Sequence, residues 1–300
     1  MKNKTIKALN LNSKVYPLYF VIGALLLYLL LYIVPSFMGL GYSFTDWNRY
    51  SSEINFIGFE NFKTVFSPDE NYIFCIYNTL KFTFFTTLFK TILGLGFALL
   101  LNEGIKLKNF HRAIIFLPAI LSMVVTGLIF RSILNPATGL LNEFLRAISL
   151  DILAQKWLVD LKWVFKSIIV VDVWKGMGYI MTIFLAGLYS IPKVYYEAAE
   201  IDGCGFWAKL RYVTLPLLIP SIIVITVLNL MYGLKVFDIV YVLTDGGPGH
   251  ASEVAYTMVF REFSLGRYAV GNTLATVMFI FMILVGYFVI RLFNKRGVEL

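Results

Sequence analysis

The chain has 300 residues, of which 59% are hydrophobic and 15% are charged, and its mean hydropathy is +0.76. These values lie far outside the range of soluble globular domains and exclude that class. The net charge of +8 does not indicate nucleic-acid binding, because the Lys and Arg residues are spread among apolar runs and form no continuous basic face.

Six apolar segments are long enough to cross a bilayer core of about 30 Å. The sequence lacks the alternation of a β-barrel, and backbone groups in lipid need internal partners, so each segment is predicted to be a helix. The prediction is an all-α membrane protein with one domain over residues 1–300: a core at 18–293 and tails at 1–17 and 294–300. The predicted spans are Leu18–Leu40, Asn78–Leu101, Ala113–Leu134, Val164–Tyr189, Leu215–Leu234 and Asn272–Phe293.

Basic residues gather at one set of span ends, which indicates the cytoplasmic side. They are Lys2, Lys4, Lys7, Lys14, Lys106, Lys108, Arg112, Lys193, Lys209, Arg211, Arg291, Lys295 and Arg296. The loops at the opposite ends, Trp47–Tyr72, Asn135–Trp163 and Phe237–Tyr268, are longer and more acidic or mixed in charge. We therefore expect both termini in the cytoplasm, together with the loop at residues 190–214.

The loop between the fourth and fifth spans is polar, with the sequence YYEAAEIDGCGFWAKLRYVTLPLLIP over residues 195–220. A short helix is predicted from about residue 194 to residue 205. Its small residues Ala198 and Ala199 permit close docking against a partner, and Gly203 lets the backbone turn before the chain re-enters lipid. The loop is therefore interpreted as a contact site for another protein.

Acidic residues accompany this predicted helix. Glu197, Glu200 and Asp202 are interpreted as charges near a helix N-terminus, where negative charge is favourable. The alternative is an amphipathic helix on the lipid headgroups, which these acids disfavour next to an anionic membrane surface.

Two spans carry polar stripes. The residues are Asp172, Lys175, Gly176 and Tyr179 in the fourth span and Asn229, Tyr232 and Gly233 in the fifth. Helical spacing places each set on one face. At 1.5 Å per residue, Tyr179 lies about 15 Å and Asn229 about 21 Å from the cytoplasmic ends of their helices. The stripes are therefore predicted to meet near mid-membrane, where amide, carboxylate, aromatic and small residues suit a sugar.

Structural roles for the same residues stay open. Asp172 and Lys175 equally fit an intramembrane ion pair that neutralises both charges. Asn229 also fits a hydrogen bond between helices, and Trp174 fits a packing or lipid-facing aromatic. Lys90, midway along the second span, is interpreted as a paired or snorkelling lysine rather than a gating residue.

The outer sequence Asp245-Gly246-Gly247-Pro248 predicts a tight turn, since glycine accepts positive φ and proline stiffens the exit. It fits either a contact with a partner outside the membrane or a simple reversal between two outer segments.

Together these motifs resemble the sugar permease subunits of ATP-binding-cassette (ABC) importers, the family of the maltose-type and glycerol-phosphate-type systems. The resemblance covers nearly the whole chain. Its motifs are SFTDW and NFIGFENFKTVF within residues 43–66, FLPAILSMVVTGLIFRSILNPATGLLN at 116–142, IP(x)4EAAEIDG(x)11LP at 191–216 and LTDGGPG at 243–249. The chain lacks the extra N-terminal helices and large outer domain of the maltose-type member, so it is similar to the shorter six-span permeases.

The resemblance implies the fold of a type I importer permease in a bacterial or archaeal cell (inner) membrane, as a multi-pass protein. The implied partners are a second, non-identical permease subunit, a cytoplasmic dimer of ABC ATPases, an extracellular solute-binding protein and the sugar itself. ATP and magnesium would bind to the ATPase, so no cofactor is expected on this chain.

The resemblance also implies roles for particular residues. Those expected to couple to the ATPase, within the loop 197–216, are Glu197, Ala198, Ala199, Asp202, Gly203, Leu215 and Pro216. Those expected to line the sugar pocket, from the polar stripes and the resemblance together, are Asp172, Trp174, Lys175, Gly176, Tyr179, Asn229, Tyr232 and Gly233. Those expected to contact the binding protein are Asp245, Gly246, Gly247 and Pro248. Asp172 and Gly233 stand where the best-known family member has amides, which implies either a pocket reshaped for another sugar or a pocket that binds sugar only weakly.

An ion-gradient-driven secondary transporter or channel is the alternative function, although such a protein works alone and has no use for a docking loop. The chain is not expected to be an enzyme. It contains no GxxxxGK[ST] phosphate loop, so it is not the ATPase. Its two histidines, His111 and His250, fall in loops on opposite sides by the predicted topology and disfavour an intramembrane serine protease.

Overall fold

The computed structural model describes residues 19–68, 70–103 and 106–294. Four helices among these residues are long and apolar enough to cross a membrane, and there are up to six spans if each of two bent helix pairs forms one span. The expected all-α class is confirmed: the described residues form helices and loops, with one isolated β-bridge between Thr45 and Phe56. The predicted start of the first span at Leu18, and the tail residues 1–17 and 295–300, lie outside the described residues.

In chain order, the first elements are α2 (Tyr19–Tyr28), the π-helix η1 (Leu29–Ile33), α3 (Val34–Tyr42), α4 (Glu60–Val65), α5 (Tyr72–Asn102), α6 (Lys108–Ile120), α7 (Met123–Ile133), α8 (Leu140–Ala147) and the short 3-10 helix η2 (Asp151–Leu153). They are followed by α9 (Val164–Ser190), α10 (Val194–Ile201), α11 (Phe206–Lys209), the π-helix η3 (Leu210–Thr214), α12 (Leu215–Leu217), α13 (Ile219–Leu234), α14 (Asp238–Thr244), α15 (Ala255–Ser264) and α16 (Tyr268–Asn294).

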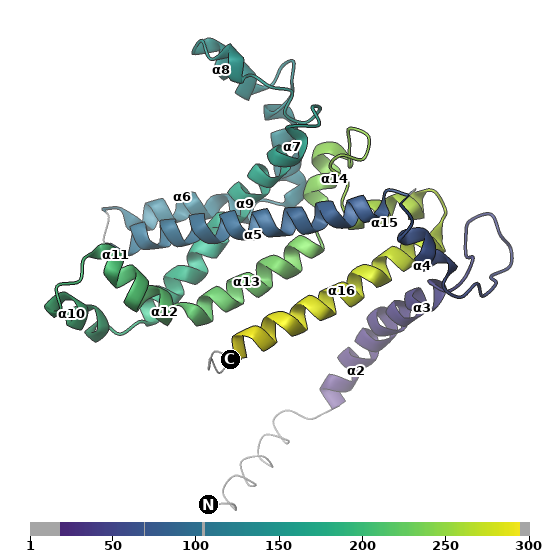
Figure 1. Ribbon diagram of the computed structural model, residues 1–300, viewed down its shortest axis with the longest axis horizontal. Coiled ribbons are helices and arrows are strands. Elements are labelled where there is room, and N and C mark those ends of the chain that lie inside the picture. The colour runs from purple at the N-terminus through teal and green to yellow at the C-terminus, as the bar shows by residue number, and fades with distance from the viewer. Residues whose placement is uncertain (1–18, 69, 104–105, 295–300) are drawn as a thin grey trace, which may run out of the picture.

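Helices α5, α9 and α13 form the centre of the bundle, and Figure 1 shows them side by side along the molecule. Two apolar clusters hold them together: one contains Phe82 and Ile168, and the other contains Phe184 and Ile225. In α9 the stretch 174–179 lies between the residues of the two clusters, and together with Asp172 it carries the predicted polar stripe. The fold therefore places polar side chains between two close-packed apolar layers.

The prediction of the third span as a single helix is wrong. This span is divided into α6 and α7, which meet at 96°. The proline Pro118 stands in the last turn of α6, where it cannot donate a backbone hydrogen bond and hinders the preceding turn. Leu121 and Ser122 then take extended conformations, with ψ of 142° and 145°. As a result α7 turns away from the bundle axis and leads to α8 at the top of Figure 1.

The fifth predicted span is also bent, by 68° where α12 gives way to α13 at Leu218. Pro216 and Pro220 stand four residues apart at this bend. Because Pro220 has no N–H, it cannot make the helical hydrogen bond to the Pro216 carbonyl. The bend lies between the polar loop that follows the fourth span and α13.

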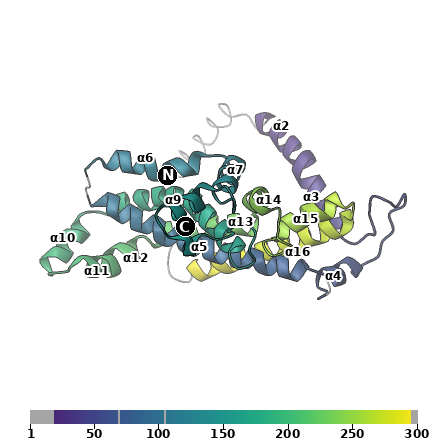
Figure 2. The same cartoon turned by 90° about the horizontal axis from the view of Figure 1, so that it is seen from above.

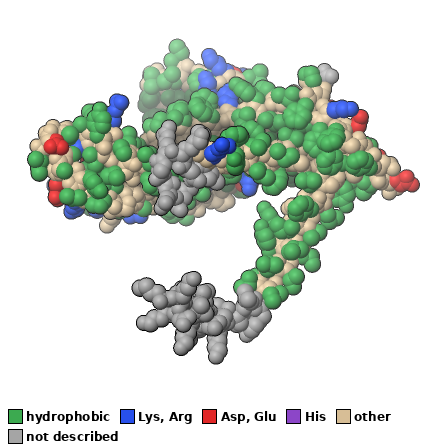
Figure 3. Space-filling model, turned by 60° about the horizontal axis from the view of Figure 1, so that its bottom comes forward, with side chains coloured by type: hydrophobic (Ala, Val, Ile, Leu, Met, Phe, Trp, Pro, Cys, Tyr) green, Lys and Arg blue, Asp and Glu red, His purple; other side chains and the backbone are tan. Residues whose placement is uncertain are grey.

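Two of the three loops predicted on the outer side are joined to each other. The Arg49 N–H donates to the Gly266 carbonyl at 2.8 Å, and the Ala269 N–H donates to the Trp47 carbonyl at 2.9 Å. Helix α10 lies at the opposite end of the molecule (Figures 1 and 2). Hydrophobic side chains are spread over the described part of the face in Figure 3, a few Lys and Arg side chains lie among them, and the acidic side chains are seen at its two ends. This distribution suits a protein that crosses a bilayer.

Close contact between α6 and α9 depends on Gly178. A Cβ atom at this position would lie 2.1 Å from the Ile115 carbonyl oxygen and 2.9 Å from the Phe116 Cα atom. These are backbone atoms, so a side chain at residue 178 would push the two helices apart.

We therefore expect Gly178→Ala to destabilise the protein by about 1–3 kcal/mol, the usual cost of overpacking. The measurement is the thermal unfolding midpoint of the purified protein in detergent. The matched control is Gly96→Ala in α5, where an added Cβ meets no atom within 4 Å. That control should unfold at the wild-type midpoint or slightly above it, because alanine favours a helix over glycine. Equal midpoints for the two variants would contradict the tight α6–α9 contact.

Candidate functional site

Polar side chains from three helices meet in the middle of the bundle. The Lys90 Nζ atom of α5 lies 2.6 Å from Asp172 Oδ2 of α9. The Tyr232 hydroxyl of α13 donates a hydrogen bond of 2.6 Å to Asp172 Oδ1, and the Lys90 ammonium lies 4.3 Å from the centroid of the Tyr232 ring. The Lys90 and Asp172 side chains are only 5% and 1% exposed. We call Lys90, Asp172 and Tyr232 the buried trio; it ties the second, fourth and fifth spans together.

Gly176 makes the buried trio possible. A Cβ atom there would lie 2.5 Å from Lys90 Cε, so a larger residue would block the path of the lysine side chain to Asp172. An unpaired charge at this depth would cost several kcal/mol, and pairing offsets much of that cost. The paired interpretation of Lys90 is thus the one that the structure supports.

Of the two roles left open for Asp172 and Lys175, an ion pair with each other is not what the structure shows. The two residues share a face of α9, but Asp172 contacts α5 and α13, whereas Lys175 points toward the third span. The Lys175 Nζ atom donates to the Ala119 carbonyl oxygen at 3.4 Å, near the C-terminus of α6. Helical spacing fixed a shared face but not which neighbouring helix each side chain would reach.

A cavity of about 390 Å³ lies beside the buried trio, within the size range of small-molecule sites. Its polar lining consists of Lys90, Asp172, Lys175, Gly176, Tyr179, Asn229 and Tyr232. Its apolar lining includes Phe116, Ala119, Ile120 and Met123, which flank the break in the third span. The break thus opens space beside the stripe on α9, and sequence reasoning missed this contribution although Pro118 marks the place.

The structure brings together six of the eight residues predicted to line the pocket. Trp174 does not line the cavity, because its ring packs against Phe130 at 5.0 Å between centroids. Gly233 does not line it either, because it faces α5, where an added Cβ would lie 2.7 Å from Thr83 Oγ1. Gly233 therefore serves close helix contact, and Trp174 takes the packing role that the sequence left open.

Asn229 contributes an amide without a partner. Its side chain is 6% exposed, and within the described part of the chain its Nδ2 atom has no hydrogen-bond acceptor. A buried N–H without an acceptor is costly, and such groups are uncommon in folded proteins. The amide lines the cavity and is free to donate to a ligand there.

Helix α10, in the loop between the fourth and fifth spans, ends at Ile201, four residues earlier than predicted. A Schellman motif closes it: the Gly203 N–H donates to the Glu200 carbonyl at 3.0 Å, and the Cys204 N–H donates to the Ala199 carbonyl at 2.9 Å. Gly203 has a φ of +74°, which glycine adopts without steric cost. A positive φ at residue 203 is therefore a structural requirement of the loop.

The interpretation of all three acids as N-terminal charges is wrong. Glu197 is in the first turn of α10, but Glu200 is in the last turn and Asp202 is the C-cap residue. Lys209 compensates Glu200 across the loop, with an Nζ–Oε1 distance of 2.7 Å. Among the residues predicted to couple, Glu197, Ala198, Asp202, Gly203 and Pro216 are exposed, Leu215 is half-buried and Ala199 is buried.

The outer sequence at residues 245–248 forms the expected tight turn. Asp245 and Gly246 have φ values of +51° and +80°, and the Gly247–Pro248 peptide bond is cis. The Ser252 hydroxyl donates to the Gly247 carbonyl at 2.6 Å and closes the turn.

Two buried glutamates anchor the segment behind this turn, and sequence reasoning missed both. Glu253 Oε1 lies 3.1 Å from Arg261 Nε and also contacts His250. Glu262 Oε2 lies 2.7 Å from Arg267 Nε. Burial raises the pKa of Glu262, and the positive charge of Arg267 opposes that rise. The only sequence signal was the arginine that follows each acid within eight residues.

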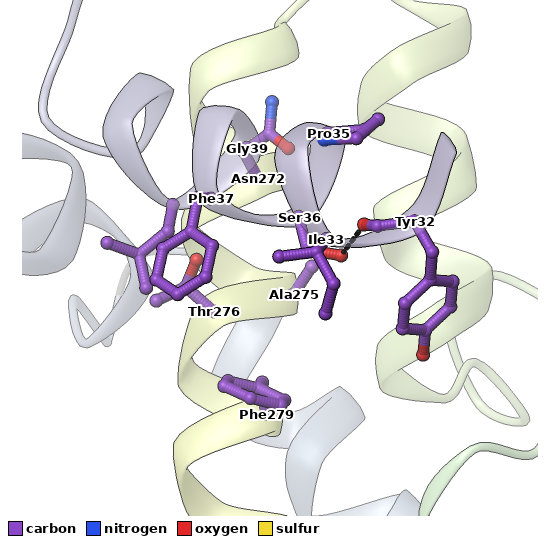
Figure 4. A pocket seen from close by; sticks show the side chains of 11 residues that line it. Tyr32, Ile33, Pro35, Ser36, Phe37, Gly39, Asn272, Ala275, Thr276 and Phe279 are labelled. Carbon is purple, nitrogen blue, oxygen red and sulfur yellow. Dashed lines mark hydrogen bonds between the residues drawn. The ribbon is translucent and has the colours of Figure 1, made fainter. Parts of the chain in front are cut away.

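A second, larger groove of about 470 Å³ lies between the first span and α16 (Figure 4). Its walls are mostly apolar, and the Ser36 hydroxyl donates its hydrogen bond to the Tyr32 carbonyl at 2.7 Å. No residue in the apolar window of the first span is buried. The groove holds no charged residue and therefore offers less recognition chemistry than the cavity beside the buried trio. Within the described residues, no group of three or more His, Cys, Asp or Glu is placed to hold a metal ion.

Comparison with known proteins gives matches along nearly the whole chain. The profile of a family described as "Binding-protein-dependent transport system inner membrane component" matches residues 90–297. The chain is 34% identical over 280 residues to the trehalose/maltose transport system permease protein MalF of Thermococcus litoralis, covering 91% of this chain and 94% of that protein. It is 33% identical over 291 residues to the probable ABC transporter permease protein YurN of Bacillus subtilis, covering 96% and 99%.

The fold also matches that of a solved ABC transporter chain. With a TM-score of 0.81 and 26% identity, the fold matches a chain of a bacterial ABC transporter involved in the import of the acidic polysaccharide alginate, covering 93% of this chain and 95% of that one.

The buried trio generates a prediction about stability. Lys90→Met leaves Asp172 without its counter-charge and should cost about 3–5 kcal/mol, as removal of one partner of a buried pair does. Asp172→Asn should also destabilise, because it leaves Lys90 unpaired. The double variant Lys90→Met/Asp172→Asn is expected to be more stable than either single variant, since it removes both charges and keeps an acceptor for Tyr232.

Thermal unfolding in detergent measures these effects. The matched control is Lys81→Met in the same helix, where the lysine is exposed. A double variant whose loss equals the sum of the two single losses would show that the two charges do not interact.

Proposed function

The chain belongs to the family of binding-protein-dependent transport system inner membrane components, and from this premise we propose that it is the membrane-spanning permease subunit of an ATP-driven importer that moves a mono- or oligosaccharide inward. The observation that carries the proposal is the likeness, over more than nine-tenths of the chain, to a trehalose/maltose permease and to an alginate importer. One relative is named for neutral sugars and the other for an acidic polysaccharide, so the relatives do not identify the sugar that this chain transports.

The orientation that we propose places α10 and both termini in the cytoplasm. Basic residues near the α10 end support it, among them Lys108, Arg112 and Lys193. The joined outer loops at the opposite end of the molecule would then face the exterior (Figure 1).

Helix α10 would dock into a groove on the ATPase. Its surface combines the acidic Glu197 with the exposed apolar side chains of Val194, Tyr195 and Ile201. A helix with apolar and acidic groups side by side suits a protein partner better than anionic lipid headgroups. The Tyr196 hydroxyl lies 3.2 Å from Thr214 Oγ1, which connects α10 to η3.

The cavity beside the buried trio would be the sugar pathway. Closure of the ATPases would draw together the loops that carry α10 in this subunit and its equivalent in the second permease subunit. The bend at Leu218 would pass that movement to α13 and to its residues Asn229 and Tyr232. Helices α9 and α13 carry most of the polar lining of the cavity, and they flank the loop that contains α10. Movement of this loop would therefore shift both helices, and the cavity would open alternately to the two sides of the membrane.

The proposed complex contains a second, non-identical permease subunit and an ATPase dimer that holds ATP and magnesium. An extracellular solute-binding protein would deliver the sugar and contact the outer turn at residues 245–248. No cofactor is proposed for this chain, and its location would be a bacterial or archaeal cell membrane.

An ion-gradient-driven carrier remains the competing function. Sugar uptake by cells should stop when the partner ATPase gene is deleted, and it should persist when a protonophore dissipates the proton gradient. The opposite pair of results would overturn the proposal.

The coupling role can be tested at Glu197. Glu197→Lys is expected to lower ATP-driven uptake in proteoliposomes by about tenfold or more, because reversing a charge at a protein interface costs several kcal/mol. Gly203→Val should act in the same direction, since valine tolerates a positive φ poorly. The matched control is Glu53→Lys, an exposed acid in an outer loop, which should transport normally. Normal uptake by both coupling variants would refute the docking role of α10.

The pathway can be tested at Tyr179 and Asn229. Tyr179→Ala and Asn229→Ala should each reduce uptake by roughly tenfold or more, since a lost contact in a small-molecule site is worth about 1–3 kcal/mol. Tyr189→Ala is the control, because Tyr189 is an exposed tyrosine of α9 outside the cavity. If the two cavity variants transport like the control, the pathway lies elsewhere.

A further inference from the structure

We propose that the cavity beside the buried trio takes a sugar that carries a singly charged anionic group, such as the carboxylate of a uronic acid, and that Lys175 binds this group. The inference rests on the proposed function of the cavity as the sugar pathway. It concerns the chemistry of the ligand, which neither the family nor the relatives determine.

The charges that line the cavity do not sum to zero. Lys90 and Asp172 cancel each other at 2.6 Å. Lys175 is the third charged residue of the lining, and no carboxylate in the described part of the chain pairs with it. The cavity therefore carries one positive charge that needs a counter-charge.

Capping of α6 explains Lys175 only in part. Its Nζ atom makes a long bond of 3.4 Å to the Ala119 carbonyl, and the C-terminus of a helix carries about half a negative charge. An ammonium has three N–H donors, so two remain for another partner. Lys175 is about 17 Å along α9 from Val164, near the middle of the span, where a lysine without a counter-charge is costly. An anionic ligand would offset that cost whenever it is bound.

The hydrogen-bonding groups of the lining also favour an acceptor-rich ligand. Asp172 is the only carboxylate among the lining residues, and both of its oxygens are engaged, by Lys90 and by Tyr232. The Asn229 Nδ2 atom is buried and without an acceptor in the described residues. The cavity thus offers free N–H donors from Lys175 and Asn229, which is the complement that a carboxylate requires.

The single positive charge of Lys175 also limits which anionic group the ligand carries. One uncompensated lysine matches one negative charge, as on a carboxylate. A phosphate group carries about −1.5 to −2 charges at neutral pH and would leave an excess negative charge in a low-dielectric site.

The test compares two disaccharides that differ in one group: maltose, and the same disaccharide with its non-reducing C6 oxidised to a carboxylate. Binding is measured by ligand-observed NMR, which registers millimolar affinities, on the complete importer without ATP in phosphatidylcholine nanodiscs at low salt. The acidic disaccharide is expected to bind at least about tenfold more tightly, a change equal to about 1.4 kcal/mol.

Variants assign the preference to one side chain. Lys175→Gln should reduce the preference for the acidic disaccharide from at least about tenfold to less than about twofold, because glutamine keeps an N–H donor but carries no charge. Lys175→Arg should retain the preference. The matched control is Lys166→Gln, an exposed lysine of the same helix outside the cavity, which should bind like the wild type. If Lys175 only capped α6, Lys175→Gln would weaken both disaccharides equally.

Several results would overturn the proposal: equal binding of the two disaccharides, tighter binding of maltose, binding of neither, or a preference that survives Lys175→Gln. Displacement of the acidic disaccharide by added phosphatidylglycerol would also overturn it, by assigning the site to a lipid headgroup. These outcomes are separate from the proposed function, which stands as long as the same purified importer, reconstituted in proteoliposomes, shows ATP-dependent uptake that requires the binding protein.

Discussion

The ion pair between Lys90 and Asp172 is the constraint on which the middle of this molecule depends. It brings α5 and α9 together at a depth where neither charge is tolerated alone, and the Tyr232 hydroxyl adds α13 to the same contact. The pair requires Gly176, because any larger residue would occupy the path of the lysine side chain. The cavity lies directly beside it, so the groups that hold the helices together also form one wall of the proposed pathway.

Much of this arrangement could be predicted from the sequence, for identifiable physical reasons. Runs of some twenty apolar residues can only be helices in lipid, so helices occur at the predicted spans, two of them bent, and the stripe at Asp172, Lys175 and Tyr179 lines the cavity. The sequence left the partner of Asp172 open, because periodicity defines a helix face but not the neighbour that this face meets. For the same reason it could not decide between the pocket and the packing role of Trp174. The prolines at 118, 216 and 220 marked the two bends, yet the direction of a bend depends on tertiary contacts that local sequence does not contain.

The two ends of the molecule differ in how their polar groups are used. Behind the outer turn, Glu253 and Glu262 are buried against arginines, and backbone hydrogen bonds join the first and last outer loops. At the other end, α10 leaves Glu197 and its apolar side chains exposed and is held by its glycine cap, the ion pair between Glu200 and Lys209 and the contact of Tyr196 with Thr214. This difference fits the proposed orientation, in which the firmly held end receives the sugar from the binding protein and the end with α10 contacts the ATPase.

The closeness of the charges in the buried trio has an electrical consequence. A cell membrane sustains a voltage, and moving one elementary charge through 100 mV changes the free energy by about 2.3 kcal/mol. Lys90 and Asp172 shift as a neutral unit, so the voltage does no net work on them when the helices rock. Lys175 is the exception, and a bound anion would cancel its charge, which would make the passage of the loaded site electrically silent.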